Sequence, residues 1–394
     1  MDLGTAAWPF SLQDPYPGYA DRRAAAPLHP LPEFGCSLVL AHREAEAILR
    51  GSEWSSDARS STALAERLGG NAGLLELGGA SVLSRDGAEH SRLRRSLGSF
   101  FSPRGAEALR PRVRAIVSSA LGQIEPGEPF ELMDEVAYPV PLAVMCELLD
   151  TGAELALTLR HETSSLVGLL DPLADEEAIA AGVGAALGLM LELVPLVAER
   201  RAAPGDDLLS ALAHEGSDLA PDEAVVMALV LLVAGHETTA NLVGNAMAVL
   251  HETPDVLRRL QGDPGQVPAA VEEVLRYESP VQLTSRIARE TVRVGETVVE
   301  PGSQVLVCLG AANRDPAVYP DPDRVELERS PRQHLAFGHG AHFCAGASLA
   351  RMEAAEVLAQ LFTAVPDFGE REITVQRGES PTFRRVSALH VVAS

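Results

Sequence analysis

The sequence predicts a mainly α-helical protein, and three observations support this fold class. Hydrophobic residues make up 46% of the 394-residue chain but aromatic residues only 4%, so a large core must consist mainly of Leu, Val and Ala. A core of that composition favours helices. Apolar residues also recur at helical spacing in several long stretches, and the longest, residues 222–253, corresponds to a helix of about 45 Å.

The N-terminal part of the chain predicts short elements between irregular segments. Residues 1–35 are rich in proline and are expected to be irregular. A short strand is expected at 36–40 and a short helix at 42–49. Residues 54–80 contain many Ser, Gly and Asn residues without clear periodicity, so they predict a long loop of the kind that often carries function.

The rest of the chain predicts a succession of helices followed by short strands. Helices are expected to begin at Asp86 and to cover 111–121, 131–149, 153–170, 176–203 and 222–253. Pro254 ends the longest of them, because the residue before a proline disfavours the helical conformation. A helix with Glu273 and Arg276 comes next, then short strands around the turn Pro301–Gly302. Short strands and turns are expected again after Pro366.

The most informative stretch is residues 337–346, which read FGHGAHFCAG. A helical pattern begins directly after it, so Cys344 lies where a glycine-containing loop meets a helix N-terminus. Unpaired N–H groups and the positive end of the helix dipole favour a thiolate there. Gly338, Gly340 and Gly346 permit tight turns and the close approach of a flat ligand. A single thiolate of this kind suits haem iron, whose porphyrin supplies four further ligands.

Two other interpretations of this stretch have to be weighed. A lone cysteine in an apolar setting is usually a small core residue. A zinc site is the more specific alternative, because histidine and cysteine are common zinc ligands and His339, His342 and Cys344 lie close together in the sequence. Structural zinc sites, however, usually contain paired cysteines and a fourth ligand, and no second cysteine lies nearby in this sequence.

A second unusual motif lies inside the helix expected at 222–253. Its middle reads AGHETT, from Ala234 to Thr239. A glycine, a carboxylate and two β-branched alcohols are poor choices for an apolar helix interior. A threonine hydroxyl can bond a carbonyl one turn earlier and open the helix locally, which often marks a functional site. Glu237 and Thr238 are therefore candidate functional residues, and the alternative is a kinked helix with satisfied hydroxyls.

Two further pairs have helical spacing. His90 and Arg94 are four residues apart and share a face, so together they can bind two oxygens of one anion. The alternative is a solvated basic stripe that includes Arg92 and Arg95. Glu273 and Arg276 are three residues apart and can form an ion pair, which contributes little to stability if it lies on the surface.

Together these motifs resemble the cytochrome P-450 superfamily, in its soluble bacterial-type form. The resemblance extends from about residue 9 to the end of the chain. It implies the triangular fold of that family, with a helix-rich lobe and a small β-rich lobe in a single domain over residues 1–394, without a fused reductase. Haem b would lie between the long central helix and the helix after the cysteine loop.

The resemblance also assigns roles to individual residues. Cys344 would be the axial ligand of the iron, with Phe337 and Gly338 shaping the loop around the sulfur. Four cationic residues would bind the haem propionates: His90, Arg94, Arg286 and His342. The pair Glu273–Arg276 would be buried, with a third partner that the sequence leaves open among Arg324, Arg329 and His334.

The activity implied is monooxygenation of a mostly apolar small molecule, most simply an intermediate of secondary metabolism. Thr238 would hold a water or dioxygen-derived species, and Glu237 would connect it to bulk solvent. O₂ is the co-substrate, and a separate ferredoxin with its ferredoxin reductase would supply electrons. Residues 54–80 and a lid at 160–195 would cover the substrate. A non-catalytic haem-thiolate sensor or a recruitment scaffold is the alternative function.

Charge and cysteine content bear on partners and location. The formal net charge of −23 argues against nucleic acid as a partner. The four scattered cysteines favour a reducing compartment, and the longest apolar run, 225–234, is too short to cross a membrane. No signal peptide is evident, so a cytoplasmic protein is expected. A basic patch for the ferredoxin is expected from four arginines, Arg104, Arg112, Arg332 and Arg351.

Overall fold

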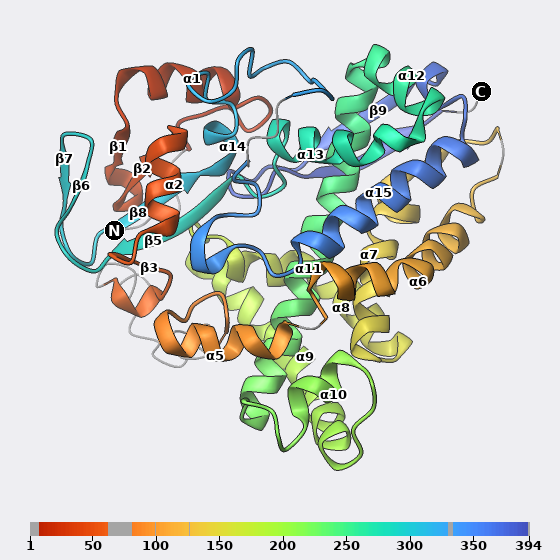
Figure 1. Ribbon diagram of the computed structural model, residues 1–394, viewed down its shortest axis with the longest axis horizontal. Helices are drawn as coiled ribbons and strands as arrows, with labels where there is room; N and C mark the ends of the chain where they lie inside the picture. Colours follow the sequence, from red (N-terminus) through yellow and green to blue (C-terminus); the bar gives the residue numbers. More distant parts are fainter. Residues whose placement is uncertain (1–7, 62–80, 99, 126, 330–333, 393–394) are drawn as a thin grey trace.

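The computed structural model describes residues 8–61, 81–98, 100–125, 127–329 and 334–392. The chain forms a triangular, helix-rich body, with most of the strands gathered at one corner (Figure 1). The expected mainly α-helical, triangular fold with a small β-rich lobe is therefore confirmed.

The helices run through almost the whole chain. Their bounds are α1 Tyr16–Ala25, α2 His42–Arg50, α5 Gly87–Leu97, α6 Pro103–Leu121, α7 Pro139–Leu149, α8 Ala153–Val167, α9 Glu176–Ala202, α10 Leu208–Ala213, α11 Pro221–Glu252, α12 Pro254–Gly262, α13 Val267–Tyr277, α14 Leu309–Ala312 and α15 Ala347–Ala364. In Figure 1 the green α11 passes through the middle of the body, and the blue α15 crosses it.

The strands form two small sheets and a hairpin. Their bounds are β1 Leu28–Leu31, β2 Cys36–Val39, β3 Trp54–Ser55, β4 Phe130–Glu131, β5 Leu283–Ala288, β6 Val292–Val294, β7 Thr297–Val299, β8 Gln304–Cys308, β9 Ile373–Arg377 and β10 Val386–Val391. The larger sheet has the order β1-β2-β8-β5-β3, in which only the pair β2–β8 is parallel. The two C-terminal strands, β9 and β10, form a sheet with β4 in the order β4-β10-β9, and β6 and β7 form the hairpin.

The long helix α11 organises the core, as the sequence predicts. Its observed bounds, Pro221–Glu252, differ by one residue at each end from the expected 222–253. Nearly every side chain between Ala224 and Leu250 is buried, and α7, α8, α9 and α15 pack against it. The expected local opening at the AGHETT motif is wrong, because the α-helix is continuous through this segment.

Other predicted bounds need correction. The helix expected at 111–121 begins eight residues earlier, at Pro103, because the Ser102 hydroxyl accepts a hydrogen bond from the N–H of Gly105 and caps it. Pro111 therefore lies inside the helix. The helix expected at 131–149 is divided: strand β4 and a π-helical turn, Met133–Ala137, precede α7.

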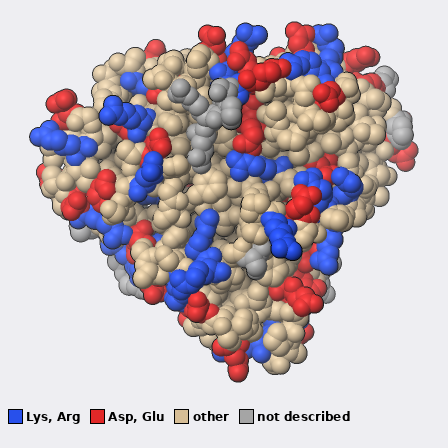
Figure 2. Space-filling view, viewed as in Figure 1, with Lys and Arg blue, Asp and Glu red and all other residues tan. Residues whose placement is uncertain are grey.

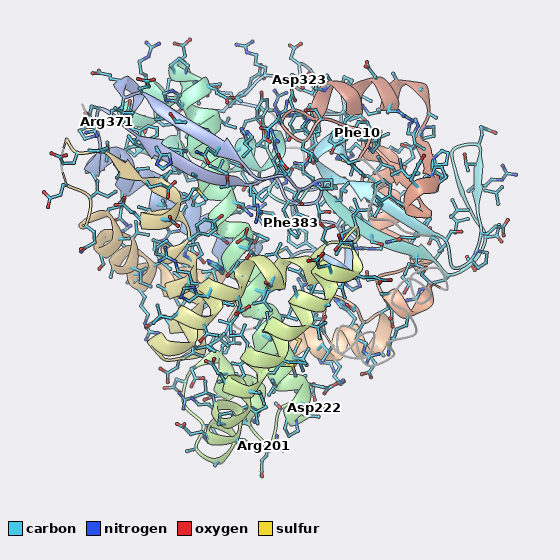
Figure 3. The ribbon with its side chains drawn as sticks, turned by 180° about the vertical axis from the view of Figure 1, so that it is seen from behind. Phe10, Arg201, Asp222, Asp323, Arg371 and Phe383 are labelled. Carbon is cyan, nitrogen blue, oxygen red and sulfur yellow. The ribbon has the colours of Figure 1, made fainter. Side chains whose placement is uncertain are left out.

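Two helices, α9 and α11, are long and apolar enough to cross a membrane by length and composition alone. The apolar stretch of α11 is 72% buried, which identifies it as a core helix. The corresponding stretch of α9 is only 28% buried. Its outer face carries Leu187, Leu191 and Val194, all more than half exposed. In Figure 3 this helix runs on the near side of the molecule toward Arg201.

Candidate active site

The cysteine loop is held by backbone hydrogen bonds between its two ends. The N–H of Cys344 donates to the carbonyl of Phe337 at 2.9 Å. Gly338 and Gly340 have φ values of +68° and +72°, in the left-handed region that favours glycine. A Cβ atom at Gly340 would lie 2.6 Å from the carbonyl oxygen of Leu49, so the loop also approaches α2 too closely for a side chain.

Cys344 precedes the start of α15, and the residue as a whole keeps a small part of its surface exposed. Burial in its surroundings raises the pKa of the thiol. N–H groups at the helix start, above all that of Gly346, and the charges of Arg94 and Arg351 act in the opposite direction. Arg351 lies 4.4 Å above the ring of Phe337, and its guanidinium bonds the Glu272 carboxylate at 2.5 and 3.0 Å.

Three of the predicted cationic residues, His90, Arg94 and Arg286, form no ion pair with a carboxylate in the described part of the chain, although Asp86 acts electrostatically on His90 and Arg286. His90 is 5% exposed, and its Nε2 has no hydrogen-bond partner in the described part of the chain. Burial, with the nearby charges of His342 and Arg94, lowers the pKa of His90 to about 4. Arg94 is partly buried, which lowers its pKa, and it makes no hydrogen bond or ion pair with the residues that the structure describes.

Arg286 lies on strand β5 and is buried, at 8% exposure. Its guanidinium donates to the Thr284 hydroxyl at 3.3 Å and to the carbonyl of Ser285 at 2.7 Å. Burial lowers its pKa to about 10. Burying a guanidinium without a bound carboxylate costs free energy, so an anion bound at Arg286 would stabilise the folded protein.

His342 joins this cluster through a residue that sequence reasoning missed, Asp86. The rings of His342 and His90 lie 4.2 Å apart, and His342 Nε2 is 3.2 Å from Asp86 Oδ1. Asp86 also accepts bonds from the Ser55 hydroxyl, at 2.6 Å, and from Arg289, at 2.8 Å. Burial alone would raise the pKa of Asp86, but these donors hold it well below its usual range. No local pattern links Asp86 to position 342.

One stripe of α11 borders on space that protein does not fill. Val230, Ala234 and Thr238 follow each other at four-residue spacing and are partly exposed, as is Gly235, although most of the residues around them on the helix are buried. The Thr238 hydroxyl donates to the carbonyl of Ala234 at 2.7 Å. This bond to the carbonyl one turn earlier was expected, and it leaves the lone pairs of the oxygen free to accept.

Glu237 differs from its neighbour, because its side chain turns into the protein. It is 2% exposed, so it has no direct contact with bulk solvent. Its Oε1 accepts a bond from Asn241 Nδ2 at 3.2 Å and lies 4.0 Å from Nη1 of Arg385. Burial raises the pKa of this carboxyl, while Arg385 and Asn241 act in the opposite direction.

These residues fit a haem better than any other group. The orphaned Nε2 of His90, the buried Arg286, and Arg94, which has no partner among the described residues, supply hydrogen-bond donors for two propionates, and the two arginines are cationic. Cys344 supplies a single thiolate at a helix start, and the partly exposed stripe of α11 provides a second wall. Phe337 and Gly338 shape the loop on the sulfur side.

The zinc alternative does not agree with the geometry. His339 and His342 face different carboxylates, at 3.6 Å from Glu46 and 3.2 Å from Asp86. Among the residues described, no group of three or more His, Cys, Asp or Glu side chains is arranged to hold a metal ion.

The pair Glu273–Arg276 is buried and anchors the segment that leads to the cysteine loop. The Arg276 guanidinium bonds Glu273 at 2.7 and 2.9 Å, and it also donates to the carbonyls of Asn313 and Pro322. The open question of a third partner is answered by Arg329, whose Nε bonds Glu273 at 3.0 Å. Arg324 contributes only its carbonyl, and His334 faces Glu272 instead.

We expect Arg276→Leu to lower the free energy of unfolding by about 3–5 kcal/mol, because it leaves the buried Glu273 carboxylate short of its partner. Urea unfolding followed by circular dichroism measures this loss. The control is Arg258→Leu, which removes an exposed pair with Asp255 of the same three-residue spacing. That variant should lose less than about 1 kcal/mol. Equal losses in the two variants would show that burial of the pair has no special effect.

Comparisons with known proteins identify the family. The cytochrome P-450 family model matches residues 198–364. The chain is 38% identical to the cytochrome P-450 monooxygenase PikC of Streptomyces venezuelae, over 99% of this chain and 94% of the relative. It is 37% identical to 6-deoxyerythronolide B hydroxylase of Saccharopolyspora erythraea, over 90% of this chain and 89% of the relative.

Solved structures agree with these relatives. P450BioI in complex with acyl carrier protein ligated to hexadec-9Z-enoic acid superposes with a TM-score of 0.89 at 30% identity, covering 97% of this chain and 99% of that one. Ligand-free CYP164A2 of Mycobacterium smegmatis gives a TM-score of 0.88 at 34% identity, covering 97% and 96%. On this sequence similarity and this fold, the chain belongs to the cytochrome P-450 family and is a haem-dependent monooxygenase.

Proposed function

We propose that the protein oxidises a mostly apolar intermediate of secondary metabolism, in the cytoplasm, with electrons from a separate ferredoxin and its reductase. The observation that carries the proposal is the pairing on α11 of a partly exposed alcohol, Thr238, with a buried acid, Glu237. A sensor or a scaffold has no use for such a pair, because neither consumes protons.

The roles of the haem-side residues follow from their surroundings. Cys344 would bind the iron, and His90, Arg94, Arg286 and His342 would neutralise the propionates. When bound through a thiolate, haem supplies the binding and activation of O₂ and favours cleavage of its O–O bond. The protein contributes the position of the sulfur and the cations that compensate the buried carboxylates.

Thr238 and Glu237 would deliver protons. Monooxygenation of a C–H bond consumes O₂, two electrons and two protons, and it releases one water. Glu237 would release a proton toward the water or dioxygen-derived species held by Thr238, whose oxygen can accept a hydrogen bond because its own hydrogen is bonded to the Ala234 carbonyl. The raised pKa of Glu237, caused by burial, favours the protonated form that a proton donor needs.

The substrate class rests on the lining of the site and on the relatives. Val230 and Ala234 present apolar surface beside Thr238. The loop between α8 and α9 is tied to the C-terminal turn by a 2.5 Å bond from the Thr382 hydroxyl to Asp171, which supports a lid in this region. One relative is named for hydroxylation of 6-deoxyerythronolide B, so hydroxylation of a polyketide-like molecule is our first expectation. Of the expected cover at 54–80, residues 62–80 lie outside the described residues.

The electron donor would dock on the face that carries α5 and α15, where Figure 2 shows several basic side chains near the middle. All 32 basic residues of the chain are arginine, which pairs well with carboxylates. Three of the four arginines expected to form a basic patch lie in the described part of the chain. Arg104 is exposed, but Arg112 pairs with Glu147 and Arg351 with Glu272. Arg332 lies outside the described residues.

Arg94→Leu should weaken haem retention, because it removes a cation that has no partner within the described chain. Transfer of haem to apomyoglobin measures retention, and we expect transfer to become about tenfold faster, the loss of one charge-assisted hydrogen bond. The control is Arg95→Leu, since Arg95 is the next residue of α5 but is exposed and faces Asp218 at 3.4 Å. Identical transfer rates for the two variants would remove Arg94 from the propionate site.

The function as a whole is tested with the purified holoenzyme. A library of apolar secondary metabolites is screened for the change in iron spin state that accompanies substrate binding. The binders are then incubated with O₂, NADPH, a ferredoxin and its reductase. An oxygenated product, formed with matching electron consumption, is the expected result. Binding without electron consumption for every ligand would favour the sensor instead.

A further inference from the structure

The hairpin formed by β9 and β10 faces a row of buried polar residues on α11. Glu237, Asn241 and Asn245 follow one face of the helix at four-residue spacing. Asn245 Nδ2 donates to the carbonyl of Arg384 at 2.7 Å, and its Oδ1 accepts from Arg377 Nη1 at 3.4 Å. Figure 3 labels Phe383 in the turn that leads into β10, close to the green α11.

Arg385 adds a contact between the hairpin and Glu237, the first of these three residues in the sequence. Its Nη1 lies 4.0 Å from Glu237 Oε1, and its side chain is 32% exposed, whereas that of Glu237 is 3% exposed. The Nε of Arg385 has no hydrogen-bond partner in the part of the chain that the structure describes. The Arg385 guanidinium thus lies between the buried Glu237 carboxyl and a more exposed region. It forms no ion pair with another carboxylate among the described residues.

The opposite strand leaves room for this side chain. Gly378 pairs with Arg385, since its N–H donates to the Arg385 carbonyl at 3.1 Å. A Cβ atom at position 378 would lie 2.4 Å from Nε and 2.7 Å from Cγ of Arg385. Only glycine therefore lets the arginine lie across the hairpin in this conformation.

The other titratable groups near Glu237 are neutral at physiological pH. Tyr138, at the start of α7, is in electrostatic contact with Glu237, and burial raises the pKa of its hydroxyl. His236 is buried beside Tyr138, and burial, with the charge of Arg160, lowers its pKa to about 4. Arg385 is therefore the charged group, among the described residues, that faces the acid.

We propose that Arg385 is the counter-ion of Glu237 and positions it for proton delivery. When the O–H bond of the Glu237 carboxyl breaks and the proton leaves toward Thr238, the guanidinium stabilises the carboxylate that remains. A proton from water then re-forms the O–H bond, so the step balances without electron transfer. The proposal rests on the proton-relay role proposed for Glu237 and Thr238. Sequence reasoning missed Arg385, which lies far along the chain and in no motif.

The test follows the carboxylic acid band of Glu237 by infrared spectroscopy of the ferric holoenzyme as a function of pH. Subtraction of the Glu237→Gln spectrum isolates the band, which disappears as pH rises through the pKa of the carboxyl. In Arg385→Gln the midpoint should move upward by about one pH unit, because an opposite charge at this distance favours the ionised form. Arg385→Lys should restore the wild-type midpoint.

Two further variants separate this role from a general effect on the hairpin. Gly378→Ala keeps the charge but displaces the Arg385 side chain, so its midpoint should also move upward. Arg377→Gln removes the neighbouring hairpin arginine, which contacts Asn245, and should leave the midpoint unchanged. A wild-type midpoint in Arg385→Gln overturns the proposal. If Glu237→Gln itself forms product with wild-type coupling, the relay has failed, whatever Arg385 does.

Discussion

Replacement of Cys344 by Ser should abolish product formation, although the chain still folds. The sulfur is the single soft ligand that the site offers, and the thiolate favours cleavage of the O–O bond. Cys344 lies outside the main core, and serine is close to it in size, so the substitution should leave the thermal midpoint of unfolding within a few degrees of wild type. Product analysis and circular dichroism measure the two effects.

The matched control is Cys146→Ala, which removes a buried cysteine of α7 from the main core. This variant should lose about 1 kcal/mol of stability, the cost of deleting a small buried group, and keep wild-type product formation per folded molecule. Product formation by the Cys344 variant at the wild-type rate would mean that another residue binds the iron.

Thr238→Ala should uncouple electron consumption from product formation. Substrate still binds, but the yield of product per NADPH should fall by about tenfold or more, since positioned proton transfer contributes at least that factor. Hydrogen peroxide should account for the missing electrons. Stability should not fall, because the hydroxyl bonds only the carbonyl of Ala234 in its own helix and alanine is the better helix former.

Thr238→Ser and Thr239→Ala are the matched controls for this prediction. Serine keeps the hydroxyl at position 238 and should remain coupled. Thr239 is the next residue of α11 but is buried at 3% exposure, so its loss should not alter the ratio of product to NADPH. If Thr238→Ala remains fully coupled, the proton-relay role of this residue has to be given up.

The sequence predicts those parts of the fold in which local pattern and tertiary packing agree. The apolar periodicity of α9 and α11 gave bounds within one residue of those observed. The prediction placed the start of α6 at Pro111, because proline is common at the first position of a helix. In the structure Pro103 occupies that first position. The helix continues through Pro111, and its packing against α15 stabilises it there. The expected opening of α11 also failed, since the Thr238 hydroxyl bonds the Ala234 carbonyl without interrupting the helix.

The residues of the candidate site also fall into two groups, those that the sequence predicts and those that only the structure reveals. Cys344, Thr238 and the pair His90–Arg94 lie in short motifs, and the resemblance of these motifs to those of the family singles them out. Asp86 contacts His342, and Arg385 contacts Glu237, across large separations in sequence, so their roles depend on which surfaces meet after folding. A sequence pattern within one element cannot reveal such partners.

The central claim is that the sulfur of residue 344 binds the iron of a haem. It is tested most directly by reducing the purified wild-type holoenzyme, adding carbon monoxide and recording the absorption difference spectrum. We expect the strongly red-shifted Soret band that distinguishes thiolate-ligated haem, and its loss in Cys344→His with haem still present. A histidine-type Soret position in the wild-type protein, or a spectrum that the Cys344→His substitution leaves unchanged, would contradict the claim.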